Sequence, residues 1–237
     1  MAVVPLRDGV SGKSRLAADL DPVARRRLVA DLARHVVGVL AAHEGVERVL
    51  VVTADVPFTR AALGGLARGP GDAPVDVVAQ PPARPGLNAA LDVGREHAAA
   101  RGARRLLVAH ADLPMLAADD VTAMLTTGGH RGSPGSGRQS GLPTRTGTAD
   151  EIPVVVGTDR HDAGTNLLVV PATAAFRFRF GAGSRAAHEA EAARHGLAVA
   201  VVRRPGTAVD LDTLDDWGQL PDDARRRLRD AVGSSLP

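Results

Sequence analysis

The sequence contains no cysteine and no tyrosine, and aromatic residues make up only 2% of its 237 residues. Without cysteine there can be no disulfide and no thiolate ligand for a metal. The shortage of aromatic side chains excludes the stacking platforms of proteins that bind single-stranded nucleic acid. The chain also lacks an apolar run long enough to cross a membrane and the pattern of a signal peptide, so we expect a cytoplasmic protein without a membrane partner.

The chain also lacks a large excess of charge of either sign. It has 29 lysine and arginine residues and 27 acidic residues, which gives a formal net charge of +2. This balance gives no support for a nucleic-acid partner. Hydrophobic residues make up 44% of the chain, enough to bury a core. We therefore expect one globular domain over residues 1–237.

Lysine and asparagine are scarce, and each occurrence falls in a glycine-containing segment. Lys13 is the only lysine in the chain, and Asn88 and Asn166 are the only asparagines. Where arginine is used everywhere else, a lone lysine indicates a site that needs a compact ammonium group.

Apolar runs alternate with segments of helical periodicity, which is typical of α/β proteins. We expect strands at 2–6, 48–53, 75–79, 105–109, 152–156, 167–170 and 198–202. We expect helices from 21–22, where aspartate precedes proline, at 56–68, 86–101 and 184–195, and from 222 onward. This alternation predicts a doubly wound, mainly parallel sheet with helices on both faces.

Residues 128–150 interrupt this pattern. They are rich in glycine, serine, threonine, proline and arginine and contain almost no apolar side chains. Because strands resume directly afterwards, we interpret the segment as a flexible polar loop or insertion within the domain, not as a linker.

The segment 7–16 follows the first strand and contains Gly12-Lys13-Ser14. It is not a P-loop, because the position five residues before Gly12 holds Arg7 instead of glycine. Lys13 and Arg15, together with backbone N–H groups, can nevertheless bind a triphosphate. The alternative interpretation is a solvated basic turn.

Asn88 lies in the first turn of the helix expected at 86–101. Its amide offers a donor and an acceptor, which suits a base edge or a ribose. The alternative interpretation is a helix-capping asparagine.

Carboxylates follow two further apolar segments. Asp112 comes directly after the strand at 105–109, where it can hold Mg²⁺ or form a turn before Pro114. Asp210 and Asp212 form a second acidic pair, and they would share a face if this segment is a strand. Two such clusters could clamp a metal across a phosphate chain.

The segment before the helix at 184–195 predicts an anion site. Ser184 is a natural N-cap, and the N-terminus of its helix favours a phosphate or carboxylate. Thr165 can add a hydroxyl group. Gly181 and Gly183 are either part of this site or plain turn glycines.

These motifs together resemble the phosphoenolpyruvate/2-phospho-L-lactate guanylyltransferases of deazaflavin coenzyme biosynthesis. Asp-Leu-Pro at 112–114 is shared with many nucleotidyltransferases, whereas Gly-Thr-Asn at 164–166 followed by Phe-Gly-x-Gly-Ser at 180–184 is specific. The other matching pieces are Lys-Ser-Arg-Leu at 13–16, Gly-Leu-Asn-Ala-Ala-Leu at 86–91, Asp-Arg-His at 159–161 and Asp-Leu-Asp-Thr at 210–213. The resemblance extends from about residue 2 to residue 218.

The resemblance implies a glycosyltransferase-A-like nucleotidyltransferase fold and transfer of GMP from GTP, with Mg²⁺, to a small phosphorylated carboxylic acid, with release of pyrophosphate. The product would pass to the next enzyme of the pathway. The implied catalytic residues are Lys13 and Asp112, and the implied nucleotide-binding residues are Lys13, Arg15 and Asn88. Thr165, Gly181 and Ser184 would bind the acid, and Asp112, Asp210 and Asp212 would hold the metal.

Three departures from the family pattern stand out, and one is that the polar insertion at 128–150 is longer than expected. Arg7 occupies a position that is usually lysine, and Asp162-Ala163 replaces the usual Gly-Thr pair before Gly164. Two alternative functions stay open: a GTP- or CTP-dependent nucleotidyltransferase with a molybdopterin or sugar-related acceptor, and a non-catalytic nucleotide- or RNA-binding protein. Phosphoenolpyruvate, 2-phospholactate and 3-phosphoglycerate are equally compatible with these motifs.

Overall fold

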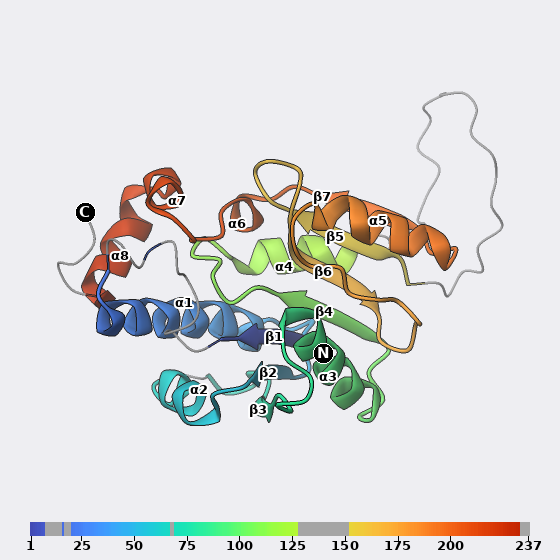
Figure 1. Cartoon of the computed structure of the whole chain (residues 1–237), viewed down its shortest axis with the longest axis horizontal. Coiled ribbons are helices and arrows are strands. Elements are labelled where there is room, and N and C mark those ends of the chain that lie inside the picture. Colours follow the sequence, from blue (N-terminus) through green and yellow to red (C-terminus); the bar gives the residue numbers. More distant parts are fainter. Residues whose placement is uncertain (8–15, 17–19, 67–68, 128–151, 233–237) are drawn as a thin grey trace.

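The computed structural model describes residues 1–7, 16, 20–66, 69–127 and 152–232. In this part of the chain the strands join into one seven-stranded sheet with the order β3-β2-β1-β4-β6-β5-β7 (Figure 1). The strands are β1 (Ala2–Leu6), β2 (Val49–Thr53), β3 (Val75–Ala79), β4 (Arg105–Ala109), β5 (Val154–Thr158), β6 (Thr165–Pro171) and β7 (Val199–Val202).

The strands are parallel except for β6. β1 pairs in parallel with β2 and β4, β2 with β3, and β5 with β7. β6 runs antiparallel to both β4 and β5. The predicted mainly parallel sheet is therefore confirmed. The reversal of β6 brings its first residues to the edge where β4 ends, because Leu167 lies opposite Ala109.

Helices cover both faces of the sheet, as expected. One face is covered by α1 (Pro22–Ala42), α2 (Val56–Leu63) and α4 (Ala118–Thr126), and the other by α3 (Leu87–Ala99) and α5 (Ser184–Arg194). Alternate residues of one strand belong to different faces: Val4 packs against the first group of helices and Val3 against the second. Burial on both faces explains why the central strands β1, β2 and β4 are largely apolar runs.

The C-terminal part of the described chain consists of α6 (Pro205–Ala208), α7 (Leu214–Gln219) and α8 (Asp222–Val232). A third apolar cluster packs α7 and α8 against the first half of α1, and it includes Leu28 and Leu32 of α1, Trp217 of α7 and Leu228 of α8. This packing brings the segment between α6 and α7 back to the centre of the sheet, although it lies about 200 residues after β1 in the sequence.

Several helix boundaries differ from the sequence-based expectation. Asp21 caps α1 as predicted, because its carboxylate accepts hydrogen bonds from the N–H groups of Val23 and Ala24. The helix expected at 56–68 ends at Leu63, and α4 was not expected. None of the described helices is long and apolar enough to cross a membrane.

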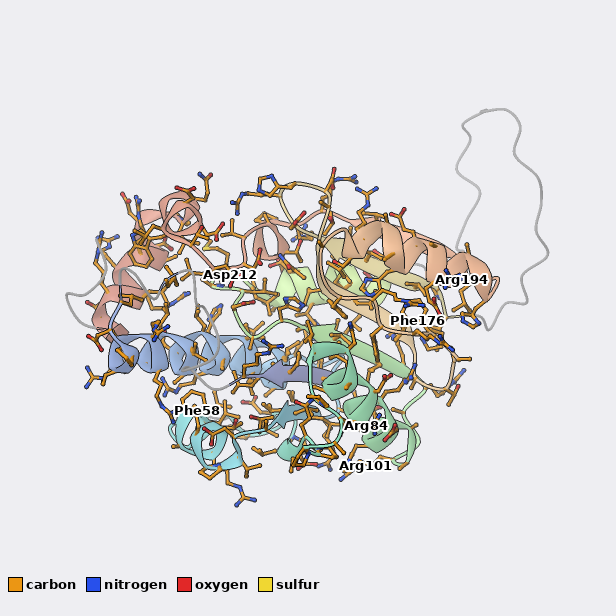
Figure 2. All side chains as sticks on the ribbon, viewed as in Figure 1. Phe58, Arg84, Arg101, Phe176, Arg194 and Asp212 are labelled. Carbon is orange, nitrogen blue, oxygen red and sulfur yellow. The ribbon has the colours of Figure 1, made fainter. Side chains whose placement is uncertain are left out.

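Figure 2 shows side chains both in the interior and on the surface of the protein. Phe176 lies beneath α5 and is fully buried. Arg101 and Arg194 are exposed, at the ends of α3 and α5.

Candidate active site at the carboxyl edge of the sheet

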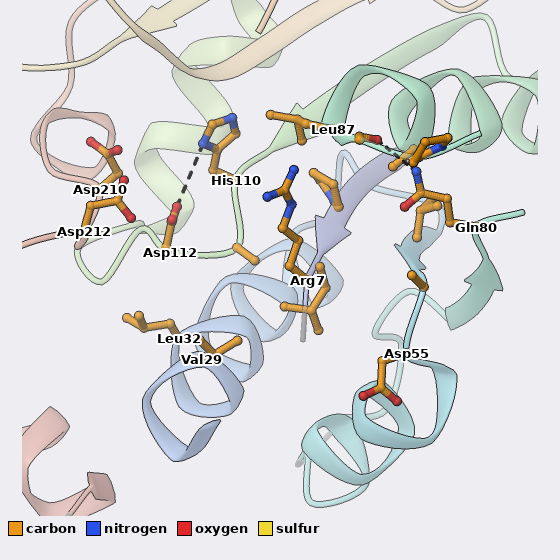
Figure 3. Close-up of a pocket in the computed structure, with 18 of the residues that line it drawn as sticks. Arg7, Val29, Leu32, Asp55, Gln80, Leu87, His110, Asp112, Asp210 and Asp212 are labelled. Carbon is orange, nitrogen blue, oxygen red and sulfur yellow. Dashed lines mark hydrogen bonds and ion pairs between the residues drawn. The ribbon is translucent and has the colours of Figure 1, made fainter. Parts of the chain in front are cut away.

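The parallel strands β1 to β4 end at one edge of the sheet, and the residues that follow them line a pocket of about 830 Å³ (Figure 3). The polar residues of the pocket that directly follow these strands are Arg7, Asp55, Gln80, His110 and Asp112. Open parallel sheets bind their ligands at this edge, and the volume suits a nucleotide-sized ligand.

Three carboxylates from two distant segments meet in this pocket. Asp112 follows β4, and Asp210 and Asp212 lie in the segment between α6 and α7. Figure 3 shows the three side chains together on one side of the pocket. The backbone joins the two segments, because the Leu211 N–H donates to the Asp112 carbonyl at 3.0 Å. That the two acidic segments clamp a metal across a phosphate chain stays a prediction.

The segment of Asp210 and Asp212 is irregular and not a strand, so the condition under which the two would share a strand face is not met. Side-chain hydrogen bonds hold it instead. The buried carboxylate of Asp216 accepts from the N–H of Asp212 and from the N–H and hydroxyl of Thr213. Arg160 pairs with Asp216 at 2.7 Å. A capping aspartate thus fixes the acidic segment against the β5–β6 connection.

The electrostatics of the acidic group favour a cation. Burial raises the pKa of Asp210, and the carboxylates of Asp112 and Asp212 raise it further. Among the described residues no three histidine or carboxylate side chains are close enough to hold a metal ion as they stand. Mg²⁺, however, takes only one or two protein carboxylates and completes its shell with water and phosphate oxygens. The oxygen donors present therefore fit a magnesium–phosphate complex.

Asn166 links the acidic segment to the sheet. It lies on β6, and its Nδ2 donates to the Thr207 carbonyl at 2.9 Å and to Asp210 Oδ1 at 3.4 Å. The N–H of His110 donates to the Asn166 carbonyl at 3.1 Å. The start of β6 is therefore next to both acidic segments.

Thr165 is almost fully buried, and its hydroxyl contacts a histidine. Oγ1 of Thr165 lies 3.0 Å from Nδ1 of His188, a residue of α5. The other ring nitrogen of His188 accepts from the Arg179 N–H at 3.0 Å. Burial, and to a smaller extent nearby His110, lowers the pKa of His188 to about 4. The ring is therefore neutral at physiological pH.

The prediction that Ser184 caps α5 is wrong. The N-cap is Gly183, whose φ of 68° lies in the left-handed region that glycine adopts without strain. Ser184 is the first helical residue and is only 3% exposed. Gly181 also has a positive φ, of 139°, and its carbonyl accepts from the Ser184 N–H at 3.1 Å. The two glycines thus form a tight turn that leads into the helix.

The amide of Asn88 bonds to the backbone of this same turn. Its Nδ2 donates to the Phe180 carbonyl at 3.1 Å, and its Oδ1 accepts from the Phe180 N–H at 2.9 Å. Asn88 is the second residue of α3 and does not act as its N-cap, which is Gly86. The amide retains one N–H and one lone pair for a ligand, so a nucleotide contact stays a prediction.

Asp162, one of the departures from the family pattern, has a φ of 56°. Aspartate is one of the few residues other than glycine that tolerate this region. Its carboxylate pairs with Arg203 at 2.8 Å and with Arg185 at 3.3 Å. Both arginines are therefore held at the β5–β6 connection, beside the beginning of α5.

Lys13 and Arg15, and the segment 128–150, lie outside the described residues. Their predicted roles, in triphosphate binding and as a polar loop, stay predictions.

No protein-family model matches the chain. Curated relatives do. The chain is 36% identical to a phosphoenolpyruvate guanylyltransferase of Sphaerobacter thermophilus over 222 residues. The aligned residues cover 93% of this chain and 91% of that protein. It is 37% identical to another phosphoenolpyruvate guanylyltransferase, of Rubrobacter xylanophilus, over 92% of both chains. The chain belongs to the phosphoenolpyruvate guanylyltransferase family. It is therefore a nucleotidyltransferase, as the sequence motifs predicted.

Further comparisons place the guanylyltransferase among related enzymes. A 3-phospho-D-glycerate guanylyltransferase of Phenylobacterium zucineum is 34% identical to it over 91% of this chain and 86% of that protein. A solved structure of a candidate nucleotide-diphospho-sugar transferase from Desulfovibrio desulfuricans G20 has a TM-score of 0.66 at 16% identity, covering 98% and 95% of the two chains. A 4-diphosphocytidyl-2C-methyl-D-erythritol synthase from Anaerococcus prevotii gives 0.56 at 8% identity, covering 96% and 95%. These structures confirm the predicted nucleotidyltransferase fold.

Sequence reasoning did not single out three residues of the guanylyltransferase pocket and its support. Gln80 directly follows β3, and its Nε2 donates to the Gly86 carbonyl at 2.9 Å, which fixes the proline-rich loop at the pocket wall. Asp216 fixes the acidic segment, and the spacing Thr-x-x-Asp at 213–216 was a signal for it. No sequence pattern marked His188, because a single histidine on a helix most often has only a structural role.

Proposed function

We propose that this guanylyltransferase transfers GMP from GTP to the phosphate of a small phosphorylated carboxylic acid and releases pyrophosphate. One observation supports the proposal most strongly: Asp112, Asp210 and Asp212 line the same nucleotide-sized pocket at the carboxyl edge of the sheet. We assign the reaction to deazaflavin coenzyme biosynthesis, where the product passes to the next enzyme.

In the proposed reaction, a phosphate oxygen of the acid attacks the α-phosphorus of GTP. The bond from that phosphorus to the oxygen bridging it to the β-phosphorus breaks, and pyrophosphate leaves with both electrons. The nucleophile is already an anion, so the chain needs no strong general base. Its residues act by positioning the two substrates and by neutralising charge.

Asp112 and one of the pair Asp210 and Asp212 would hold Mg²⁺ together with triphosphate oxygens. When bound, the ion would neutralise charge on the triphosphate and on the leaving pyrophosphate. The raised pKa of Asp210 supports this assignment, because three unneutralised carboxylates repel one another. Lys13 and Arg15 would bind the triphosphate. Arg7, which points into the pocket, would add a further cation there.

Asn88 would contact the nucleotide, and Thr165, Gly181 and Ser184 would contact the acid. The tight turn at 181–183 supports the second assignment, because it leads into α5, whose N-terminus is the positive end of the helix dipole and favours an anion. Phosphoenolpyruvate is our first choice of acid, since the relatives of 36% and 37% identity carry its name. 3-Phosphoglycerate is the second, supported by the relative of 34% identity.

The test is pyrophosphate release from each of GTP, CTP and ATP with phosphoenolpyruvate, 2-phospholactate or 3-phosphoglycerate in the presence of Mg²⁺. We expect turnover with GTP and with one acid far above the others. We expect Asp112→Asn to lower kcat by about 10²–10³, typical of losing one element of electrostatic stabilisation, with an unchanged melting temperature. Asp119→Asn, an exposed acid on α4, is the matched control. Near-normal turnover of Asp112→Asn throughout a Mg²⁺ titration would contradict the metal assignment.

A further inference from the structure

His188 is a fully buried polar residue between the proposed acid site and the aromatic core. It lies one helical turn after Ser184 on α5. The ring of Phe180 meets it edge-on, with centroids 4.7 Å apart, and the ring of Phe176 stacks on it at 5.9 Å. These contacts fix the plane of the imidazole, so its two nitrogens have fixed directions.

The hydrogen-bond partners of the ring decide its tautomer. The backbone N–H of Arg179 can only donate, so Nε2 of His188, 3.0 Å away, must be an unprotonated acceptor. A neutral imidazole carries one proton, which must then lie on Nδ1. Nδ1 therefore donates to Oγ1 of Thr165 at 3.0 Å.

This tautomer also settles the role of the Thr165 hydroxyl. A hydroxyl that accepts from His188 must direct its own proton elsewhere. In the part of the chain that the structure describes, the Thr165 hydroxyl has no other hydrogen-bond partner. Thr165 is the first residue of β6. The next residue, Asn166, contacts Asp210 of the acidic segment through its side chain. Its proton is thus left for a group that enters the site.

We propose that His188 is a positioning residue that keeps the Thr165 hydroxyl as a hydrogen-bond donor to an anionic oxygen of the acid substrate. A hydroxyl locked as a donor recognises phosphate and carboxylate oxygens, which only accept, and discriminates against alcohols and amides that present a donor. The inference rests on the proposed function, which places Thr165 at the acid.

The test uses two substitutions that each mimic one ring nitrogen. His188→Asn places an amide N–H near the position of Nδ1, so it can still donate to Thr165. His188→Gln reaches the position of Nε2, so it can accept from the Arg179 N–H but no longer orients Thr165. We expect His188→Gln to raise KM for phosphoenolpyruvate about tenfold while KM for GTP stays within twofold, because a hydrogen bond to a charged group is lost. His188→Asn should restore KM for the acid to within about threefold of the wild type.

A double-mutant cycle isolates the link between the two residues. In a Thr165→Val background, which lacks the hydroxyl, changing His188 to Gln should add less than twofold to KM for the acid. Ala190→Gln, at an exposed position of the same helix, is the control for helix stability. Melting curves accompany every variant. If His188→Gln does not fold, His188→Asn carries the test, and a tenfold rise in its KM for the acid overturns the inference.

Equal effects on both substrates, or additive effects in the cycle, would also overturn it and leave His188 with a purely structural role. Failure of the proposed function is distinguishable, because the wild type would then release no pyrophosphate with any acid.

Discussion

The negative charge of Asp210 opposes the stability of the metal-free fold. Its carboxyl group is partly buried beside Asp112 and Asp212, which raises its pKa. A carboxyl group whose pKa is higher in the folded than in the unfolded state binds its proton more tightly when folded. The free energy of unfolding therefore falls as the pH rises from below the unfolded pKa through the raised folded pKa. At neutral pH the metal-free protein carries the full cost.

Asp210→Asn should therefore stabilise the metal-free protein while it abolishes activity. At pH 7 in EDTA we expect the melting temperature to rise by about 2–4 °C, the response of a domain of this size to about 1 kcal/mol. At pH 3.5 the difference should vanish, because Asp210 is then protonated in the wild type. Mg²⁺ should raise the melting temperature of the wild type but not of the variant. Asp215→Asn, an exposed neighbour, serves as the control. A variant that melts below the wild type in EDTA would contradict this account.

The functional residues were predictable to different degrees. Asp112 could be placed because it follows an apolar run, and Asn88 because it lies in the first turn of the helix after a strand-end loop. Strand ends are where parallel sheets bind ligands. Ser184 was assigned one position too early in its helix, because Gly183, with a positive φ, takes the N-cap position. The partner of Thr165 could not be predicted, since His188 is 23 residues away and the contact depends on how α5 packs on the sheet.

At the scale of elements, loop length explains the direction of β6. Six residues, 159–164, separate β5 from β6. A parallel connection needs a crossover of about a dozen residues or more, whereas an antiparallel one does not. The spacing of the two apolar runs thus contained the information, although alternation of strands and helices alone suggested a parallel pair. By contrast, the lengths of β1, β3 and β4 could be predicted because each is a largely apolar run bounded by polar or turn residues.

The contact between α6 and α4 depends on a glycine. A Cβ added at Gly206 would lie 1.9 Å from Oδ2 of Asp120 and 2.8 Å from the Met115 carbonyl. Asp120 is held in place, since it pairs with Arg204 at 3.0 Å and accepts from the Ala117 N–H at 2.9 Å. The loop that carries Asp210 starts directly after α6, so displacing α6 would also disturb the acidic group.

Gly206→Ala should therefore destabilise the protein by about 1–3 kcal/mol, as overpacking does. The matched control is Gly218→Ala in α7, where an added Cβ meets nothing within 4 Å. That change should stabilise by about 0.4–1 kcal/mol, because alanine has fewer unfolded conformations than glycine. Urea unfolding of both variants gives the two free energies. Equal values for the two would show that the close approach at Gly206 is relieved without cost.

The polar segment between α4 and β5 is predicted to contribute little to stability. Residues 129–146 contain almost no apolar side chains that could be buried. Shortening a loop changes its closure entropy only slightly, by about 0.6 kcal/mol for each halving of its length. Deleting most of 129–146 should therefore shift the melting temperature by no more than about 2 °C. A fall of many degrees would show that the segment packs on the body, and loss of activity alone would give it a role with substrate.

At the scale of the whole molecule, the sheet has two parts that meet at the antiparallel pair of β4 and β6. The strands β3, β2, β1 and β4 carry the residues proposed for the nucleotide, and β6, β5 and β7 support those proposed for the acid. Asp112 follows β4 and Asp210 follows β7 and α6, and both line the same pocket. A nucleotidyl transfer needs both substrates in line, so the geometry of this junction matters more than that of either part alone.

Asn88 is the side chain that connects the two substrate regions most directly. It belongs to α3, on the nucleotide side, yet both ends of its amide bond to Phe180 in the turn before α5. Any nucleotide that touches Asn88 is thereby linked to the position of Gly181 and Ser184. We therefore predict that GTP and the acid bind cooperatively in the wild type, and that Asn88→Ala removes most of this coupling.

The measurement is a calorimetric titration of the acid in the presence and absence of a non-hydrolysable GTP analogue. Coupling free energies of this kind are typically about 1–3 kcal/mol, so the wild type should bind the acid about 5–150-fold more tightly with the analogue present. In Asn88→Ala the ratio should fall toward one. Loss of two hydrogen bonds to the backbone of the buried Phe180 should also lower stability by about 1–3 kcal/mol. Ala100→Ser, at the exposed end of α3, controls for changes to the helix. If the variant weakens GTP alone and keeps the full ratio, Asn88 contacts the nucleotide without communicating with the turn. If the ratio falls toward one, the two hydrogen bonds between Asn88 and Phe180 are what makes acid binding depend on an occupied nucleotide site.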